Sequence, residues 1–529
     1  MKKRIFLIGF SVFVIFGMLM STLPRESQAI PPFARKYQTA CTTCHWATFP
    51  KLNAFGRAFR ASGLRIPFGN DEVFVRDKPV SLGADIWSSL FPKALWPSDM
   101  PGLPPVGLAF KSEFNMTRER NRNPMGVGAT RRDNFPGNFF SGIGSVELFS
   151  GGTLGETLSW FGVVGIFDNE GFGGSTTDID RAYFNWAPFI FGEQGYVNVR
   201  FGQFEPRAVP VSNHRRQIRL TPYLMDIFPV LPAGNFFGFA PTQKGIEIWG
   251  SLNGFGGKGG LEWAAGIVNG QPGGALGAFD GASGVAGTIR DNVNTRNNGR
   301  FDVNSGKDWY VTASYKIGGM GVLGEEGVAE KLELTENWQD NSIRIKGYYY
   351  QGTTGAFTDT IGGGIGNAAF LGGATNDNWD EDANQFKRFG VVLDANWWNF
   401  NIIGAASYME DDLKGTTTFN AMGNMPLETG DKFDVEIYTT EVQYVANPWL
   451  VPSFRFEKIN PDYDVRDLNT FERYSFDVAI LARANIKFLA GATFSSLPDA
   501  RTGTNGLDMA NPDLPPFDDM WRIGVDIDF

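Results

Sequence analysis

The sequence contains little cysteine, histidine and charge for its length. Two cysteines and two histidines stand among 529 residues, so a framework of several disulfides is excluded. The sequence also shows no cluster of cysteine and histidine with the spacing of a zinc site. Charged residues make up 20% of the chain, and the formal net charge is −10. Because nucleic-acid binding requires a basic surface on the main domain, we expect no nucleic-acid partner.

Long apolar runs are missing beyond the N-terminus. Basic residues 2–4 precede an apolar stretch from Ile5 to Met20, and Ser27-Gln28-Ala29 follows it. This order predicts a signal peptide over residues 1–29. A membrane anchor is the alternative, but the stretch is shorter than the roughly 20 residues that span a bilayer. No later stretch reaches 18 consecutive apolar residues, so any further membrane crossing must use strands.

The two cysteines lie in the run Cys41-Thr42-Thr43-Cys44-His45. Cys-x-x-Cys-His is the attachment pattern of c-type haem. Thiols three positions apart on one helical turn can form thioethers with the two vinyl groups, and the adjacent His presents its imidazole to the iron. A disulfide or a redox-active dithiol is the alternative, but neither explains the following His. We expect one covalent haem c on Cys41 and Cys44, with His45 as the proximal iron ligand.

Residues 30–79 form a basic head around this motif, with eight Lys and Arg against three acidic residues. Phe49-Pro50-Lys51-Leu52 predicts a helix start, and Gly63 predicts its end. Leu52, Phe55 and Phe59 recur at helical spacing, so they either cover a porphyrin face or form a plain helix core. A head of about 50 residues is too small to bury a haem alone, and we expect it to pack into the rest of the chain.

The remainder alternates apolar and polar residues with a period of two, which predicts strands. Sixty-six glycines and 14% aromatic residues suit a transmembrane β-barrel with a wet interior. A soluble β-sandwich is the alternative, but it would carry fewer inward charges. The clearest alternating segments are 309–317, Ile343 and Ile345 against Arg344 and Lys346, Phe433, Val435 and Ile437 against Asp434 and Glu436, and 521–529.

Sixteen strands of the length that crosses a membrane fit residues 105–529. Their connections mostly alternate long and short, although 318–340 is long for a turn. Because outer-membrane barrels have long outer loops and short periplasmic turns, this rhythm predicts that both termini lie in the periplasm and that the head enters the lumen from there. Residues 80–104 are left as a linker. We expect strand starts near 105, 139, 157, 178, 195, 242, 260, 307, 341, 385, 400, 432, 449, 471, 486 and 519.

The motif region resembles the outer-membrane monohaem cytochrome–porin fusions of iron-oxidising bacteria. The resemblance covers Phe33 to His45, Phe49 to Asn53 and Phe55-Gly56-Arg57, about 30 residues in all. Gln203-Phe204 and 244–247 also look like pieces of phosphate-selective-type porins. The resemblance implies that a haem head plugs a porin barrel in the outer membrane and passes electrons from extracellular Fe(II) to periplasmic cytochromes.

Neither the motif nor the resemblance identifies the distal haem ligand. His214 lies in the predicted third outer loop, where Arg215, Arg216 and Arg219 could pair with haem propionates. A surface histidine in a basic loop is the plainer interpretation, and Met100, Met116, Met125 or no ligand are further possibilities. In the predicted outer loop 352–384, carboxylates could gather Fe(II) or belong to a solvated or calcium-bound loop; they are Asp377, Asp380, Glu381 and Asp382.

Electron transfer with Fe(II) as donor is the function that these patterns favour, as an iron:cytochrome c oxidoreductase-type activity. The same architecture could instead deliver electrons outward to an external acceptor, because direction depends on a reduction potential that sequence does not reveal. A solute porin with an auxiliary haem is the alternative from another class, although the acidic barrel disfavours anion uptake.

Overall fold

The structure is a computed structural model that describes the head and the barrel strands. No helix in this part of the chain is long and apolar enough to cross a membrane. The predicted signal peptide lies outside the described residues, which are 32–47, 49–67, 74–75, 80–81, 89–90, 99–100, 106–120, 133–134, 137–138, 145–154, 157–168, 178–211, 223–227, 239, 242–270, 306–325, 338–357, 379–412, 432–463, 470–483, 485–496 and 519–528.

Short helices belong to the head and to one loop, and long strands make up the rest. The helices are α2 (Pro32–Tyr37), α3 (Cys41–Cys44), α4 (Ala54–Ala61), α7 (Leu224–Ile227) and the 3-10 helix η2 (Phe255–Gly257). The long strands are β3 (Val106–Arg120), β6 (Ser145–Leu154), β7 (Leu158–Asp168), β8 (Asp178–Trp186), β9 (Asn198–Phe204), β10 (Gln243–Asn253), β11 (Lys258–Val268), β12 (Asp308–Met320), β13 (Ser342–Phe357), β14 (Trp379–Trp397), β15 (Phe400–Asp412), β16 (Lys432–Tyr444), β17 (Leu450–Tyr463), β18 (Phe471–Arg483), β19 (Ile486–Ser496) and β20 (Asp519–Asp528).

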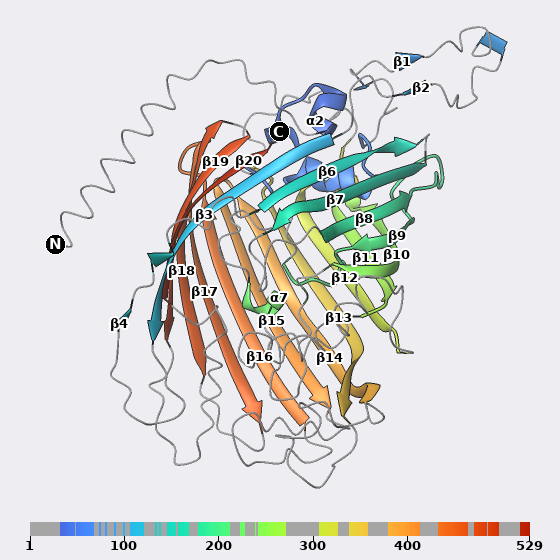
Figure 1. The fold of residues 1–529 in the computed structure, drawn as a ribbon. Helices are drawn as coiled ribbons and strands as arrows, with labels where there is room; N and C mark the ends of the chain where they lie inside the picture. Colours follow the sequence, from blue (N-terminus) through green and yellow to red (C-terminus); the bar gives the residue numbers. More distant parts are fainter. Residues whose placement is uncertain are drawn as a thin grey trace.

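These sixteen strands pair antiparallel with their neighbours and close into a barrel (Figure 1). The last strand, β20, pairs with the first, β3, so that Asp528 lies opposite Ala109. The two-residue strands β4 (Asp133–Asn134) and β5 (Gly137–Asn138) pair with β3 beside this closure. The predicted antiparallel barrel of sixteen strands is confirmed. The strand starts differ most from the prediction at β6 and β14.

Among the residues that the structure describes, the segment before the barrel contributes no strand to the wall. β1 (Val80–Ser81) pairs with β2 (Asp99–Met100) in a separate two-stranded sheet. The wall therefore begins at β3, and the head is joined to it through residues that include this small sheet.

The barrel turns its apolar side chains outward and its charged side chains inward. On β12, Ile317 is 59% exposed while Lys316 is 4% exposed, and on β13 the values are 49% for Ile345 and 6% for Lys346. This is the reverse of a soluble protein, in which apolar burial drives folding. Lipid solvates an apolar exterior, and a closed barrel satisfies every backbone group of the wall.

On β16 the predicted direction of alternation is wrong. Val435 and Ile437 are fully buried toward the lumen, whereas Asp434 and Glu436 are half-buried on the other face. The reason is an apolar cluster inside the barrel, in which Leu224 of α7 packs with these two side chains. The chain that follows β9 folds into the lumen, so the interior is not uniformly wet.

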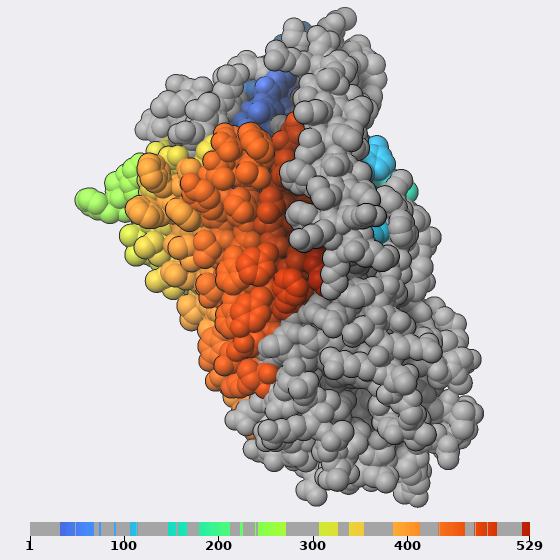
Figure 2. Space-filling view, turned by 90° about the vertical axis from the view of Figure 1, so that its left-hand side faces the viewer, coloured from blue at the N-terminus to red at the C-terminus, as the bar shows by residue number. Residues whose placement is uncertain are grey.

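Short connections gather at one end of the barrel, where the head also lies (Figure 1). The chain turns in two residues between β14 and β15, and in five between β16 and β17. The connection between β12 and β13 is longer because part of it holds the head: the Trp46 indole donates to the Trp338 carbonyl at 3.1 Å. Figure 2 shows the head, in blue, seated at that end against the strands of the C-terminal half.

Candidate functional site

The motif residues form a single helical turn followed by an extended residue. Cys41 and Cys44 are the first and last residues of α3, and both are free thiols. His45 follows with φ −103° and ψ 142°, and its backbone pairs with Leu52 in an isolated bridge. The two cysteines thus lie one helical turn apart, as their spacing predicts, and His45 follows them directly.

Asn53 fastens this turn to helix α4. Its side-chain oxygen accepts a hydrogen bond from the Gly56 amide at 2.9 Å, and its amide group donates to the carbonyls of Thr42 and Thr43 at 3.2 and 3.0 Å. The predicted helix start at Phe49-Pro50 is therefore wrong, because Asn53 is the N-cap and α4 begins at Ala54. An asparagine cap contributes about 1 kcal/mol to helix stability.

Two glycines fix how α4 lies against the motif and where it ends. A Cβ atom on Gly56 would collide with the carbonyl oxygen of Cys44, so only glycine lets α4 approach α3 this closely. Gly63 has φ +73°. The amide of Gly63 donates to Arg60, and the amide of Leu64 donates to Phe59, which is the Schellman pattern. The predicted helix end at Gly63 is confirmed.

An apolar cluster with several aromatic rings packs against Cys44. Tyr37, Phe55 and Phe59 are buried in it with Leu64 and Ile66. The ring of Phe59 meets the Phe33 ring at 5.3 Å and the Tyr37 ring at 5.9 Å, both edge to face. Phe55 and Phe59 thus occupy the predicted stripe. Leu52 lies outside the helix and does not continue it.

Cys41, Cys44 and His45 are half-buried, and this burial shifts the pKa of each side chain. It raises the pKa of the Cys41 thiol to about 11 and that of the Cys44 thiol to about 12, and it lowers the pKa of the His45 imidazole to about 4. The imidazole is neutral at pH 7 and keeps a lone pair for a metal. Two thiols one helical turn apart, one neutral imidazole and an apolar wall fit a covalent haem c.

Lysine and arginine side chains of the head tie it to the lumen wall. Lys51 is 1% exposed, and its ammonium group donates to Asn401 at 2.5 Å and to Gln443 at 2.8 Å. The same group lies 4.0 Å from the centre of the Trp46 ring. Arg57 forms an ion pair with Asp394 at 3.0 Å. These contacts use strands β14, β15 and β16.

Other strands of the wall also hold the head. Lys487 of β19 donates to the Phe49 carbonyl at 2.7 Å, and Arg65 donates to the Leu158 carbonyl of β7 at 2.6 Å. Asn198 of β9 donates to the carbonyl of Ala61 at 3.3 Å. Because the contacts come from several parts of the wall, the head is held within this end of the barrel.

The structure leaves the proposed distal ligands open. His214 and Met125 lie outside the described residues, and so do Arg215, Arg216 and Arg219. Met100 and Met116 lie in β2 and β3, but their side chains are not described. Sequence reasoning missed Met320, whose half-buried side chain at the end of β12 packs against the cluster around Cys44. The spacing of a methionine in a distant strand gives no signal of this proximity.

Three of the four carboxylates predicted to lie in an outer loop and gather Fe(II) lie in a strand instead. Asp377 lies outside the described residues, whereas Asp380, Glu381 and Asp382 belong to strand β14 rather than to a loop. Among the residues that the structure describes, no three His, Cys, Asp or Glu side chains gather as metal ligands.

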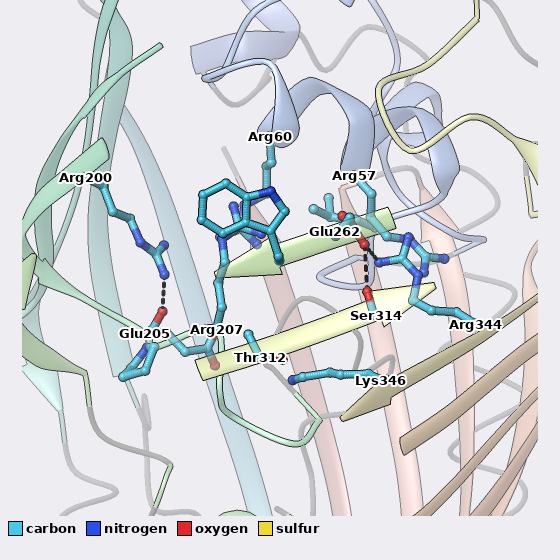
Figure 3. Close-up of a pocket in the computed structure, with 13 residues that line it drawn as sticks. Arg57, Arg60, Arg200, Glu205, Arg207, Glu262, Thr312, Ser314, Arg344 and Lys346 are labelled. Atoms are coloured by element: carbon cyan, nitrogen blue, oxygen red, sulfur yellow. Dashed lines mark hydrogen bonds and ion pairs between the residues drawn. The ribbon is translucent and has the colours of Figure 1, made fainter. Parts of the chain in front are cut away.

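Sequence reasoning also missed a basic chamber beneath the head (Figure 3). It is a partly open cavity of about 100 Å³. Head residues form its roof, and strands β9, β11, β12 and β13 form its walls with the start of the chain that follows β9. Its charged lining is Arg57, Arg60, Arg200, Glu205, Arg207, Glu262, Arg344 and Lys346.

No family model and no curated protein matches the chain. The chain is similar to several solved outer-membrane proteins. OmpT of Vibrio cholerae, in trimer form, is 8% identical over 80% of this chain and 98% of its own, with a TM-score of 0.43. Salmonella typhi OmpF, in complex with daunomycin, is 10% identical over 80% and 97%, with a TM-score of 0.43. The outer membrane channel DcaP of Acinetobacter baumannii is 10% identical over 80% and 96%, with a TM-score of 0.41. The barrel assignment itself rests on the strand pairings.

Proposed function

We propose that this protein is an outer-membrane electron-transfer cytochrome. A haem c on Cys41 and Cys44, with His45 as proximal ligand, would take electrons from extracellular Fe(II) and pass them to a periplasmic cytochrome. One observation carries the proposal: the Cys-x-x-Cys-His turn is held inside the short-turn end of a closed barrel whose outer face is apolar.

The barrel supports a place in the outer membrane. Its exposed Ile, Val, Phe and Trp side chains lie on the strands, where a bilayer would solvate them. Short turns in such barrels face the periplasm, and the head lies at that end. Both the head and the C-terminal strand end would then face the periplasm, within reach of a soluble partner.

The head's own residues supply what an electron-transfer site needs. A bound haem provides a one-electron Fe(III)/Fe(II) couple. Asn53 and Gly56 hold the motif turn rigid against α4, and the cluster of Tyr37, Phe55 and Phe59 excludes water from its apolar side. Lys51 and Arg57 keep the plug seated, so that electrons, rather than iron, would cross the barrel.

The visible spectrum of the oxidised, purified protein tests this function. Addition of Fe(II) should produce the absorption bands of a reduced c-type haem, and dithionite should add little more. The Cys41→Ser, Cys44→Ser double variant is the control and should contain no covalent haem. A wild-type protein without covalent haem would contradict the proposal.

The same spectra also test the direction of electron flow. A haem that dithionite reduces but Fe(II) does not has too low a potential to accept electrons from iron. That result would favour the same architecture working outward, from periplasmic donor to external acceptor.

A solute porin with an auxiliary haem is the second candidate. The basic chamber favours it, because cationic side chains that line a lumen attract anions. The conductance of the reconstituted protein separates this candidate from a plugged conduit.

A further inference from the structure

The basic chamber contains more positive than negative side chains. Six cationic groups and two carboxylates line it, so its own lining carries a net charge of +4, in a chain whose total charge is −10. The imbalance arises because helix α4 directs Arg57 and Arg60 from the head into a lumen wall that is already basic (Figure 3).

Most of these cations have an anionic partner. Arg200 and Arg207 share Glu247, at 2.8 and 3.1 Å, and Arg344 pairs with Glu262. Arg57 pairs with Asp394, as described above. Glu247 also accepts a hydrogen bond from the Tyr310 hydroxyl. One carboxylate therefore serves two guanidinium groups and leaves them less than fully balanced.

Arg60 differs from the other cations. Its side chain is half-buried and points into the chamber (Figure 3), yet within the described part of the chain it forms no ion pair or hydrogen bond. Burial lowers its pKa, and the charges of Arg200 and Arg181 lower it further against the opposing effects of Tyr183 and Glu205. A partly buried cation held among other cations is costly unless an anion joins it.

The neighbouring cations are already fixed in place. The Arg207 guanidinium lies 3.7 Å from the centre of the Trp249 ring, and Arg200 lies 4.3 Å from the Phe204 ring. Arg200 also donates to the Glu205 carbonyl at 2.7 Å. Because stacking and hydrogen bonds hold both groups, an arriving anion orders few side chains and loses little affinity to entropy.

We propose that the chamber binds one oxyanion group, a carboxylate or a phosphate, with Arg60 as its anchor and Arg200 and Arg207 beside it. Such groups match the planar fork of guanidinium donors. Two sources supply this chemistry: a propionate of the haem, which rests on the proposed function, and a free anion in the lumen, which does not.

The path from the thiols to the chamber makes a haem carboxylate a reasonable source. Helix α4 carries Phe55 and Phe59 on the face toward Cys44 and Arg60 on the face toward the chamber. From the cluster around Cys44, ring contacts lead through Phe161 to Tyr183 at 5.8 Å, and Arg200 lies 5.6 Å from the Tyr183 ring. The apolar site and the basic chamber are therefore contiguous.

Calorimetric titration with inorganic phosphate tests the site in two forms of the full chain, one haem-loaded and one made haem-free by Cys41→Ser and Cys44→Ser. We expect the haem-free form to bind phosphate, and Arg60→Gln to weaken this binding by about tenfold or more, the typical loss of a charge-assisted hydrogen bond. Arg60→Lys should retain part of the affinity. Lys258→Gln, which removes an exposed cation at the same barrel end, should not change it.

Comparison of the haem-loaded and haem-free forms identifies the source of the bound oxyanion. If a propionate occupies the chamber, the loaded protein binds no phosphate and Arg60→Gln shifts its reduction potential. If the natural ligand is a free anion, both forms bind phosphate and Arg60→Gln leaves the potential unchanged. A wild-type chain without haem would refute the proposed function while the phosphate titration still tests the chamber. Two results together would refute the proposed anion site. The haem-free form, shown to be folded by heat-modifiable migration on gels, would bind no phosphate, and Arg60→Gln would leave the reduction potential of the haem-loaded form unchanged.

Discussion

Burial controls the chemistry of the three motif residues. The thiolate is the reactive form of cysteine, and burial keeps both thiols protonated well above neutral pH. The imidazole of His45 is neutral by the same cause. A docked head therefore offers a good metal ligand but two unreactive thiols, and we expect thioether formation to precede insertion of the head into the barrel.

Thiol alkylation of the haem-free, folded chain measures this burial. A thiol with a pKa of about 11 in place of 9.0 is ionised about 100-fold less at pH 8. Iodoacetamide should thus react at least that much more slowly with the folded chain than with the chain in guanidinium chloride. Raising the pH from 8 to 10 should speed the folded reaction throughout, whereas the unfolded reaction should level off above pH 9.

An exposed thiol provides the control for this experiment. Phe255 in η2 is fully exposed, and a Phe255→Cys reporter in a chain without the two natural cysteines should react equally fast in both states. Equal rates for the natural cysteines would instead mean that the head is not docked.

At the scale of elements, the sequence predicts the wall better than the plug. Period-two alternation is clear in strands such as β12 and β13, because lipid outside and charge inside act on each strand separately. Together with the expected strand length, it is enough to predict sixteen strands. On β16 the direction was misread because Val435 and Ile437 face α7, a long-range contact. In the head, the motif spacing predicted α3. The hydrogen bonds of Asn53 and the close approach at Gly56 both depend on the packing of α3 against α4. A local sequence pattern does not predict such packing.

The crossing at Gly56 is the most sensitive point of the head. Gly56→Ala places a methyl group against the Cys44 carbonyl, and overpacking of this kind costs about 1 to 3 kcal/mol. We expect lower covalent haem content per folded barrel, measured by pyridine haemochrome against heat-modified protein on gels. Gly347→Ala, in β13, meets no atom within 4 Å and should leave the haem content unchanged. A fully haem-loaded Gly56→Ala protein would show that α3 and α4 do not meet in this way.

On the scale of the whole molecule, total charge and local field have opposite signs. The chain is acidic, which led us to expect little affinity for anions, but the chamber beneath the plug is basic. Fe(II) is a divalent cation, and the low dielectric around buried cations strengthens its repulsion from them. The lumen is thus a poor route for iron ions at this depth. This agrees with the proposed function, in which electrons move while the metal stays outside.

Conductance in planar bilayers tests this combination of plug and field. Because contacts from around the wall hold the head, the intact chain should conduct far less than an open barrel of sixteen strands. Any remaining current should favour anions in a salt gradient, since permeating ions would pass the chamber, and Arg60→Gln should reduce that preference while Lys258→Gln should not. A large anion-selective current would favour the solute porin over the electron-transfer cytochrome. A large cation-selective current would contradict both the plug and the basic chamber, because neither could then lie across the conducting path.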